Sequence, residues 1–110
     1  MIIIAGHLRV AASERDQYLT AVERVAIKAR QAPGCQDFVQ SADPIDPERI
    51  NIYERWDSDE LLMSFRTSGD EDEHQLLTPE LLGAEVAKYR ISAVERRWLG
   101  AASRAYARSW

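Results

Sequence analysis

The sequence predicts an α+β domain in which two helices cover one face of a four-stranded antiparallel sheet. The 110 residues are 45% hydrophobic and 29% charged, a composition typical of one soluble globular domain. Segments in which apolar and polar residues alternate recur along the chain, as expected for strands. Two other segments repeat apolar residues every three or four positions, as expected for helices.

The first two elements are a strand over residues 2–11 and a long helix over residues 14–31. In the strand, Leu8 and Val10 alternate with His7 and Arg9. Ser13 lies three residues before Asp16, a spacing typical of a helix N-cap. The helix stripe consists of Tyr18, Leu19, Val22, Val25, Ala26 and Ala29, and Pro33-Gly34 ends the helix.

Two further strands are predicted over residues 35–41 and 49–56. The first contains Phe38 and Val39, and the second alternates strictly, with Ile50, Ile52, Glu54 and Trp56 on one face. The connection contains Asp43-Pro44 and Asp46-Pro47, which favour turns and exclude a helix. These strands therefore form an antiparallel hairpin.

The last part of the chain holds a short helix, an acidic loop and a final strand. Asp57 and Glu60 have capping spacing, Leu61, Leu62 and Phe65 supply the apolar face, and Ser68-Gly69 ends this helix. Residues 70–74 form an acidic loop because four adjacent carboxylates repel one another. Residues 78–83 allow one helical turn, and residues 85–98 alternate as a strand.

The resulting order, βαββαβ, is that of the ferredoxin-like arrangement. The helices cover one face only, yet apolar residues lie on both, so we expect a second copy of the chain to cover the bare face. A homodimer through the sheet faces, a dimeric α+β barrel, is the prediction. The domain spans residues 1–98, and two interpretations of the tail 99–110 stay open, a short helix or a frayed end.

Charge and composition exclude several classes of function. The formal net charge of −4 argues against a nucleic-acid-binding domain. The single cysteine, Cys35, cannot form an internal disulfide and fits a reducing compartment, the cytoplasm. No stretch has the length of a membrane span. Phosphate loops, nucleophile elbows and zinc-binding motifs are absent from the sequence, which predicts no metal or cofactor site.

Two short motifs resemble the antibiotic biosynthesis monooxygenase family of dimeric α+β barrel proteins. They are Pro33-Gly34-Cys35 after the long helix, and Tyr53-Glu54-Arg55-Trp56-Asp57-Ser58 between a strand and a helix. The resemblance implies the same fold, a homodimer, and oxidation of small aromatic compounds such as quinols or polyphenols by dioxygen without metal or flavin. Many members carry a histidine where this chain has Phe65.

His7 and Trp56 are the candidate catalytic residues. His7 lies where relatives have a polar active-site residue, and an imidazole can accept a phenolic proton near neutral pH. Its alternative role is that of a half-exposed strand residue paired with a neighbour. Trp56 ends the clearest strand, where its indole either stacks on a substrate or packs in the core.

Other residues have weaker assignments. Tyr18, Phe38, Tyr53 and Phe65 are expected in the wall of the pocket or in the core. Glu54 and Arg55 are expected in a salt bridge or dimer contact, and His74 is the candidate haem ligand. Three functions stay open: a cofactor-independent monooxygenase, a non-catalytic dimeric small-molecule-binding module, and a haem-degrading relative.

Overall fold

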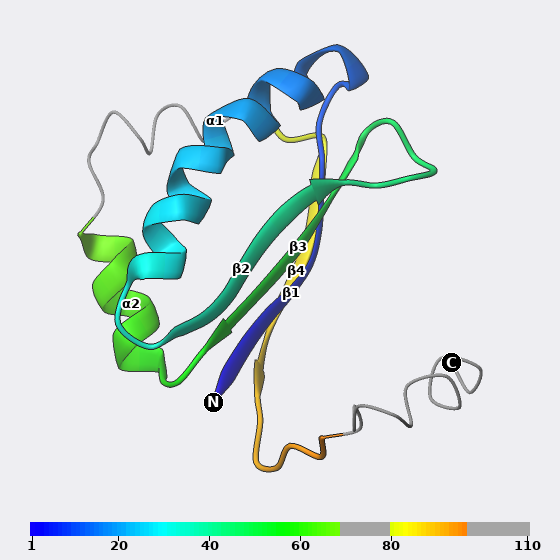
Figure 1. The fold of residues 1–110 in the computed structure, drawn as a ribbon. Coiled ribbons are helices and arrows are strands. Elements are labelled where there is room, and N and C mark those ends of the chain that lie inside the picture. Colours follow the sequence, from blue (N-terminus) through cyan, green and yellow to red (C-terminus); the bar gives the residue numbers. More distant parts are fainter. Residues whose placement is uncertain (69–79, 97–110) are drawn as a thin grey trace, which may run out of the picture.

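Figure 1 shows a computed structural model of the chain, which describes residues 1–68 and 80–96. Its elements are β1 (Ile2–Arg9), α1 (Ala12–Gln31), β2 (Cys35–Ala42), β3 (Arg49–Trp56), α2 (Asp59–Thr67) and β4 (Gly83–Arg90). This order confirms the predicted ferredoxin-like fold. Both helices lie on the same side of the sheet (Figure 1).

The sheet has the strand order β2-β3-β1-β4, and every neighbouring pair is antiparallel. β3 alternates between half-buried and buried residues along its whole length, as its sequence pattern predicts. The face that neither helix covers is called the open face below. It carries Ile3, Ala5, His7 and Arg9 of β1 and the residues paired with them on β3 and β4.

The core lies between the sheet and the helices as two neighbouring clusters. One gathers around α1 and contains Tyr18, Val22 and Phe38, and the other lies under α2 and contains Trp56 and Leu62. Phe65 and Leu8 pack against both clusters and so join them. Phe38 is 4% exposed on the helix side, while its neighbour Val39 is half-buried on the open face.

Gly34 and Gly6 occupy backbone conformations that favour glycine. Gly34 has a φ of +83° and turns the chain from α1 into β2, where its carbonyl accepts a 2.8 Å hydrogen bond from the Asp57 amide. Gly6 has a φ of +151°, and a Cβ there would lie 2.7 Å from the Cα of Val86. Its missing side chain therefore lets β1 and β4 approach closely.

The predicted cap residues of both helices were wrong. α1 begins at Ala12, and its N-cap is Ala11, which makes no side-chain cap, so Ser13 lies inside the helix. The N-cap of α2 is Ser58 rather than Asp57, and its hydroxyl accepts a 3.2 Å bond from the Leu61 amide. α1 thus begins two residues earlier than a cap at Ser13 would allow, and α2 begins one residue later than a cap at Asp57 would.

The last strand differs from its prediction at both ends. β4 begins at Gly83, which the sequence had suggested as the end of a helical turn, and it ends at Arg90 rather than near residue 98. Residues 91–96 are irregular although their sequence continues to alternate. The described part of the chain offers no strand to pair with them, because β1 begins at Ile2 opposite Arg90. The predicted acidic loop 70–74 and the tail 99–110 lie outside the described residues.

Candidate functional site

Trp56 is fully buried at the end of β3. It packs with Ile2, Ile4, Ile52 and Leu62, and its ring centroid lies 5.4 Å from that of Phe65, with the rings tilted by 33°. The two residues come together because β3 leads directly into α2 and Phe65 lies on the inner side of that helix. With an exposed fraction of 0%, Trp56 offers no surface to a ligand in this conformation.

Glu54 is a buried carboxylate beside Trp56. The indole Nε1–H of Trp56 donates to Glu54 Oε1 over 3.0 Å, and Glu54 is 7% exposed. Burial raises the pKa of Glu54, while the hydrogen bond from Trp56 and the charge of Arg66 lower it by less. The described residues give Glu54 no salt bridge, contrary to the sequence-based expectation. Glu54 and Trp56 are two residues apart in β3, so both side chains lie on the helix face, and this spacing is the sequence signal for the pair.

His7 lies on the open face, away from Trp56. Its Nε2 is 3.8 Å from Glu85 Oε2 of β4, and it pairs with Asn51 across β1–β3, whereas Trp56 pairs with Ile2. His7 and Trp56 therefore lie on opposite faces of the sheet and do not share a pocket in one protomer. Tyr53 is also on the open face, apart from the other aromatic candidates.

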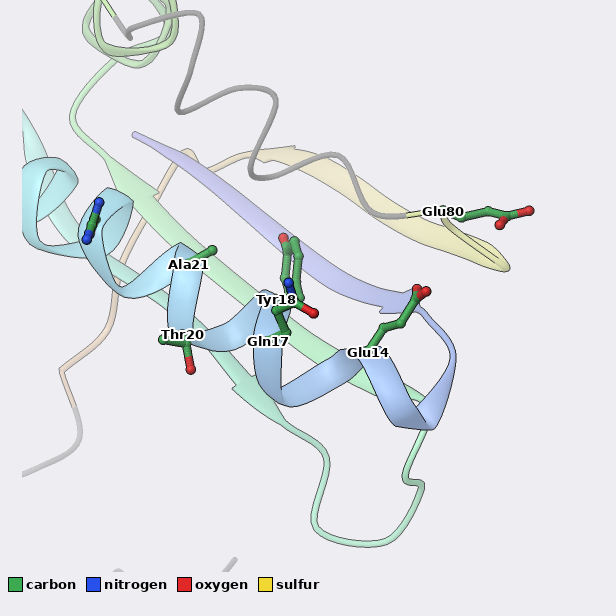
Figure 2. A pocket seen from close by; sticks show the side chains of 7 residues that line it. Glu14, Gln17, Tyr18, Thr20, Ala21 and Glu80 are labelled. Carbon is green, nitrogen blue, oxygen red and sulfur yellow. The ribbon is translucent and has the colours of Figure 1, made fainter.

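A cavity of about 650 Å³ lies beside α1 (Figure 2). Tyr18 forms its buried wall, and Figure 2 shows Tyr18 and Glu14 on the side of α1 that faces β1, with Glu80 across the opening just before β4. The lining residues are Glu14, Gln17, Tyr18, Thr20, Ala21, Arg24 and Glu80. Of the predicted pocket residues, only Tyr18 is among them.

The Tyr18 hydroxyl donates a 2.7 Å hydrogen bond to Gln40 Oε1 of β2. Burial raises the pKa of this phenol, and the bond to Gln40 lowers it by less, so the group stays protonated at neutral pH. Because its own proton is donated to Gln40, the Tyr18 oxygen can accept a hydrogen bond from a ligand. Phe38 belongs to the same core cluster and supports this wall from behind.

The other lining residues were not predicted, because those on α1 have the polar character of a solvated helix face. They line a cavity only because Glu80, more than fifty positions later in the chain, comes to lie opposite α1. The spacing of apolar residues within one helix or strand does not indicate which distant segment will lie opposite it.

Neither metal ligation nor thiol chemistry is indicated within residues 1–68 and 80–96. No three histidine, cysteine, aspartate or glutamate side chains gather there. Cys35 is half-buried, and burial, followed by the charges of Glu54 and Asp37, raises the pKa of its thiol. His74, the haem-ligand candidate, lies outside the described residues. In the part of the chain that the structure describes, no helix combines the length and the apolar character needed to cross a bilayer.

Comparison with solved structures shows which proteins share this fold. A Deinococcus radiodurans protein described as a candidate antibiotic biosynthesis monooxygenase superposes with a TM-score of 0.73 at 19% identity, over 89% of this chain and 99% of that one. A protein so described from Nitrosomonas europaea gives 0.74 at 13% identity, over 84% and 100%. A third, from Chloroflexus aurantiacus, gives 0.70 at 26% identity, over 86% and 96%.

Comparison with curated protein sequences gives no match. The family model described as antibiotic biosynthesis monooxygenase matches residues 1–75, about two thirds of the chain, from β1 through α2. The structural neighbours show the shared fold, and the family match supports a monooxygenase-like role in general terms. The chain therefore belongs to the antibiotic biosynthesis monooxygenase family.

Proposed function

We propose that the protein is a cofactor-independent monooxygenase that oxidises a small aromatic hydroxy compound, of the quinol or polyphenol type, with dioxygen. The observation that carries the proposal is the cavity beside Tyr18. Its volume of about 650 Å³ lies within the range of about 300–1,000 Å³ typical of small-molecule sites. The cavity combines an aromatic wall with charged groups near its opening, which suits a flat substrate with ionisable hydroxyls.

The proposed reaction starts with loss of a proton from the bound substrate. The lining carboxylates of Glu14 and Glu80 are in place to accept a phenolic or enolic proton, and the guanidinium of Arg24 stabilises the anion that results. Tyr18 accepts a hydrogen bond from a second substrate hydroxyl. These roles follow from the residue types that line the cavity.

The electron-rich anion then passes one electron to dioxygen, which avoids the spin barrier that protects neutral organic molecules. The two radicals combine to form a carbon–oxygen bond, and the peroxide loses water to leave a carbonyl. Counted on the keto tautomer of the substrate, in which the reacting ring carbon is a CH₂ group, one CH₂ and one O₂ thus become one C=O and one H₂O, and the substrate supplies all the electrons.

The two sequence-based catalytic candidates take other roles in this proposal. Trp56 is a positioning residue, because it is fully buried and holds Phe65 of α2 against the sheet. His7 belongs to the open face, where we place the contact with a second copy of the chain. The half-buried apolar residues Ile3 and Val39 and the 51% exposed Tyr89 support a homodimer through that face.

The lone cysteine is in keeping with a reducing compartment, and we place the enzyme in the cytoplasm.

The test is oxygen uptake and product formation with anthrones and hydroquinones, under air and under argon. Ala21→Phe, which fills the cavity, should lower turnover more than tenfold. Ala12→Phe, the same change at an exposed position of α1 outside the cavity, should leave turnover unchanged.

Three outcomes would contradict this proposal. Wild-type protein without oxygen-dependent turnover is not an oxygenase of these substrates. Saturable binding of the aromatic compound without product would instead select the non-catalytic binding module, which the packing of Phe65 against Trp56 favours. If Ala21→Phe were fully active and His7→Ala inactive, the chemistry would lie on the open face.

A further inference from the structure

The open face is divided into a polar end and an aromatic end. His7, Asn51 and Glu85 lie side by side across the sheet at one end, and Ile3 and Tyr89 lie side by side at the other. Ala5, Tyr53 and Ala87 form the row between them. A face of this kind is specific about the orientation of whatever covers it, because polar groups must find polar partners.

The side chain of Arg55, at the aromatic end, has no hydrogen-bond or ion-pair partner among residues 1–68 and 80–96. Its register neighbours are Ile3 on β1 and Asp37 on β2, but its Nε is buried and forms no hydrogen bond in the described part of the chain. The nearest cation contact of Asp37 is instead with Arg30 Nε, at 3.9 Å. The Nε atom itself lies too deep for a second chain to reach, but the Arg55 side chain is only half-buried and forms no ion pair with the described residues. A carboxylate from outside these residues is therefore expected at its terminal nitrogens.

Glu85, at the polar end, offers an acceptor. Its side chain is 83% exposed, and its one ion pair within the described ranges is the 3.8 Å contact with His7. It projects from the same face as Arg55, since residues paired in an antiparallel ladder share a face. The face thus carries one donor that needs a partner and one carboxylate that is open to receive it.

We infer that a second copy of the chain packs on the open face with its two-fold axis over Ala5, so that each Arg55 meets the partner's Glu85. The inference rests on the homodimer of the proposed function and specifies its contacts. Arg55 of β3 is paired with Ile3 of β1, and Glu85 of β4 is paired with His7 of β1. β1 is the strand between β3 and β4. Ala5 is therefore midway between Arg55 and Glu85 along the strand and across the sheet.

The geometry of sheet packing is compatible with this axis. Arg55 and Glu85 are separated by roughly 13 Å along the strands and roughly 10 Å across them. A two-fold axis parallel to the sheet and perpendicular to the line between them exchanges the two positions. The strands of the two sheets then cross at roughly a right angle, which is one of the two common classes of sheet packing.

The small side chain of Ala5 permits the two sheets to approach closely at the two-fold axis. The same rotation places His7 above the partner's Tyr53. Two sheets about 10 Å apart are within joint reach of an arginine and a glutamate side chain. The open face measures roughly 19 Å by 26 Å, or about 500 Å² before side-chain relief is counted. This is of the order of the 800 Å² or so that each partner buries in a stable dimer.

The test is charge reversal and its rescue, measured by sedimentation velocity on the full chain. Arg55→Glu and Glu85→Arg should each raise the dimer dissociation constant at least tenfold, because each places like charges opposite one another. The double variant Arg55→Glu/Glu85→Arg should restore it to within about threefold of the wild-type value. Glu60→Arg, an exposed reversal on α2 far from the open face, is the matched control and should leave the dimer unchanged.

The outcomes separate this inference from the proposal on which it rests. A wild-type protein that is monomeric at 100 μM would overturn both the homodimer and the pair. A wild-type dimer that survives both single reversals, or single losses that the double variant does not rescue, would overturn the pair and the axis only. Circular dichroism of each variant identifies loss of folding, and oxygen-uptake assays on the same samples test the cavity separately.

Discussion

Replacing Gly34 with alanine tests how tightly α2 is packed against the turn that leaves α1. The φ of +83° there is unfavourable for any residue with a Cβ and costs about 1–2 kcal/mol. The new Cβ would also collide with the Leu61 side chain, lying 2.9 Å from its Cβ, and overpacking of this kind costs about 1–3 kcal/mol. We expect Gly34→Ala to lower the free energy of unfolding by about 2–5 kcal/mol.

Urea denaturation followed by tryptophan fluorescence measures this loss. With a slope of about 1–3 kcal/mol per molar urea, the midpoint should fall by at least about 0.7 M. Gly83→Ala is the control, because its Cβ would meet Arg9 Cδ at an ordinary 3.7 Å and its φ is not positive. If the two variants unfolded within about 0.5 kcal/mol of each other, the account of the turn would be wrong.

Three further predictions concern caps and buried charge. Ser58→Ala should lower the free energy of unfolding by about 1 kcal/mol, because it removes the N-cap of α2. Ser13→Ala should have almost no effect, because Ser13 caps no helix. If urea titrations gave equal losses for the two variants, Ser13 would have to be a cap after all. Burial raises the pKa of Glu54 above its ordinary 4.5. The wild type should therefore lose stability relative to Glu54→Gln as pH rises from 4.5 through the raised pKa. If the difference between the urea midpoints of the two proteins stayed constant from pH 4 to 8, this account would be wrong. Hydrogen bonds from two β4 cations, Lys88 and Arg90, lower the pKa of Asp59 below its ordinary 3.8. Asp59→Asn should therefore lower the melting temperature at pH 7, and the difference from the wild type should shrink as pH falls below 3.8 through the lowered pKa. A difference that stayed constant over that fall in pH would argue against an ionic origin.

Local patterns predicted the elements and the topology well. The alternation of β3 fixed which side of the strand is buried, because a strand that contacts helices on one face must bury every second residue. The turn residues between β2 and β3 identified the hairpin, since two prolines leave no room for a crossover helix. The caps were less predictable, because Ser13 and Ser58 have similar sequence surroundings and only the direction of the incoming chain decides which side chain reaches a free amide.

The site was much harder to predict than the fold. A cavity depends on where two distant segments leave space, and Glu80 and α1 carry no joint signal in the sequence. His7 and Trp56 each fit a catalytic role by residue type, but their register in the β1–β3 ladder separates them. Arg55 was readable as a contact residue from its position on the outer face of β3, and the lack of a partner emerges only from the packed structure.

The order of strands in the sheet has a consequence for how the chain is made. Of the four strands that the structure describes, β1 is made before the others, yet it is an interior strand, and its second neighbour, β4, is the last of the four to leave the ribosome. Until then, one side of β1 presents unsatisfied amides and carbonyls along with Ile2, Ile3 and Ile4, the kind of edge on which nascent chains pair with each other. Variants that weaken the docking of β4 should therefore reveal themselves first as inclusion bodies during expression, before any loss of stability is measurable in the purified protein.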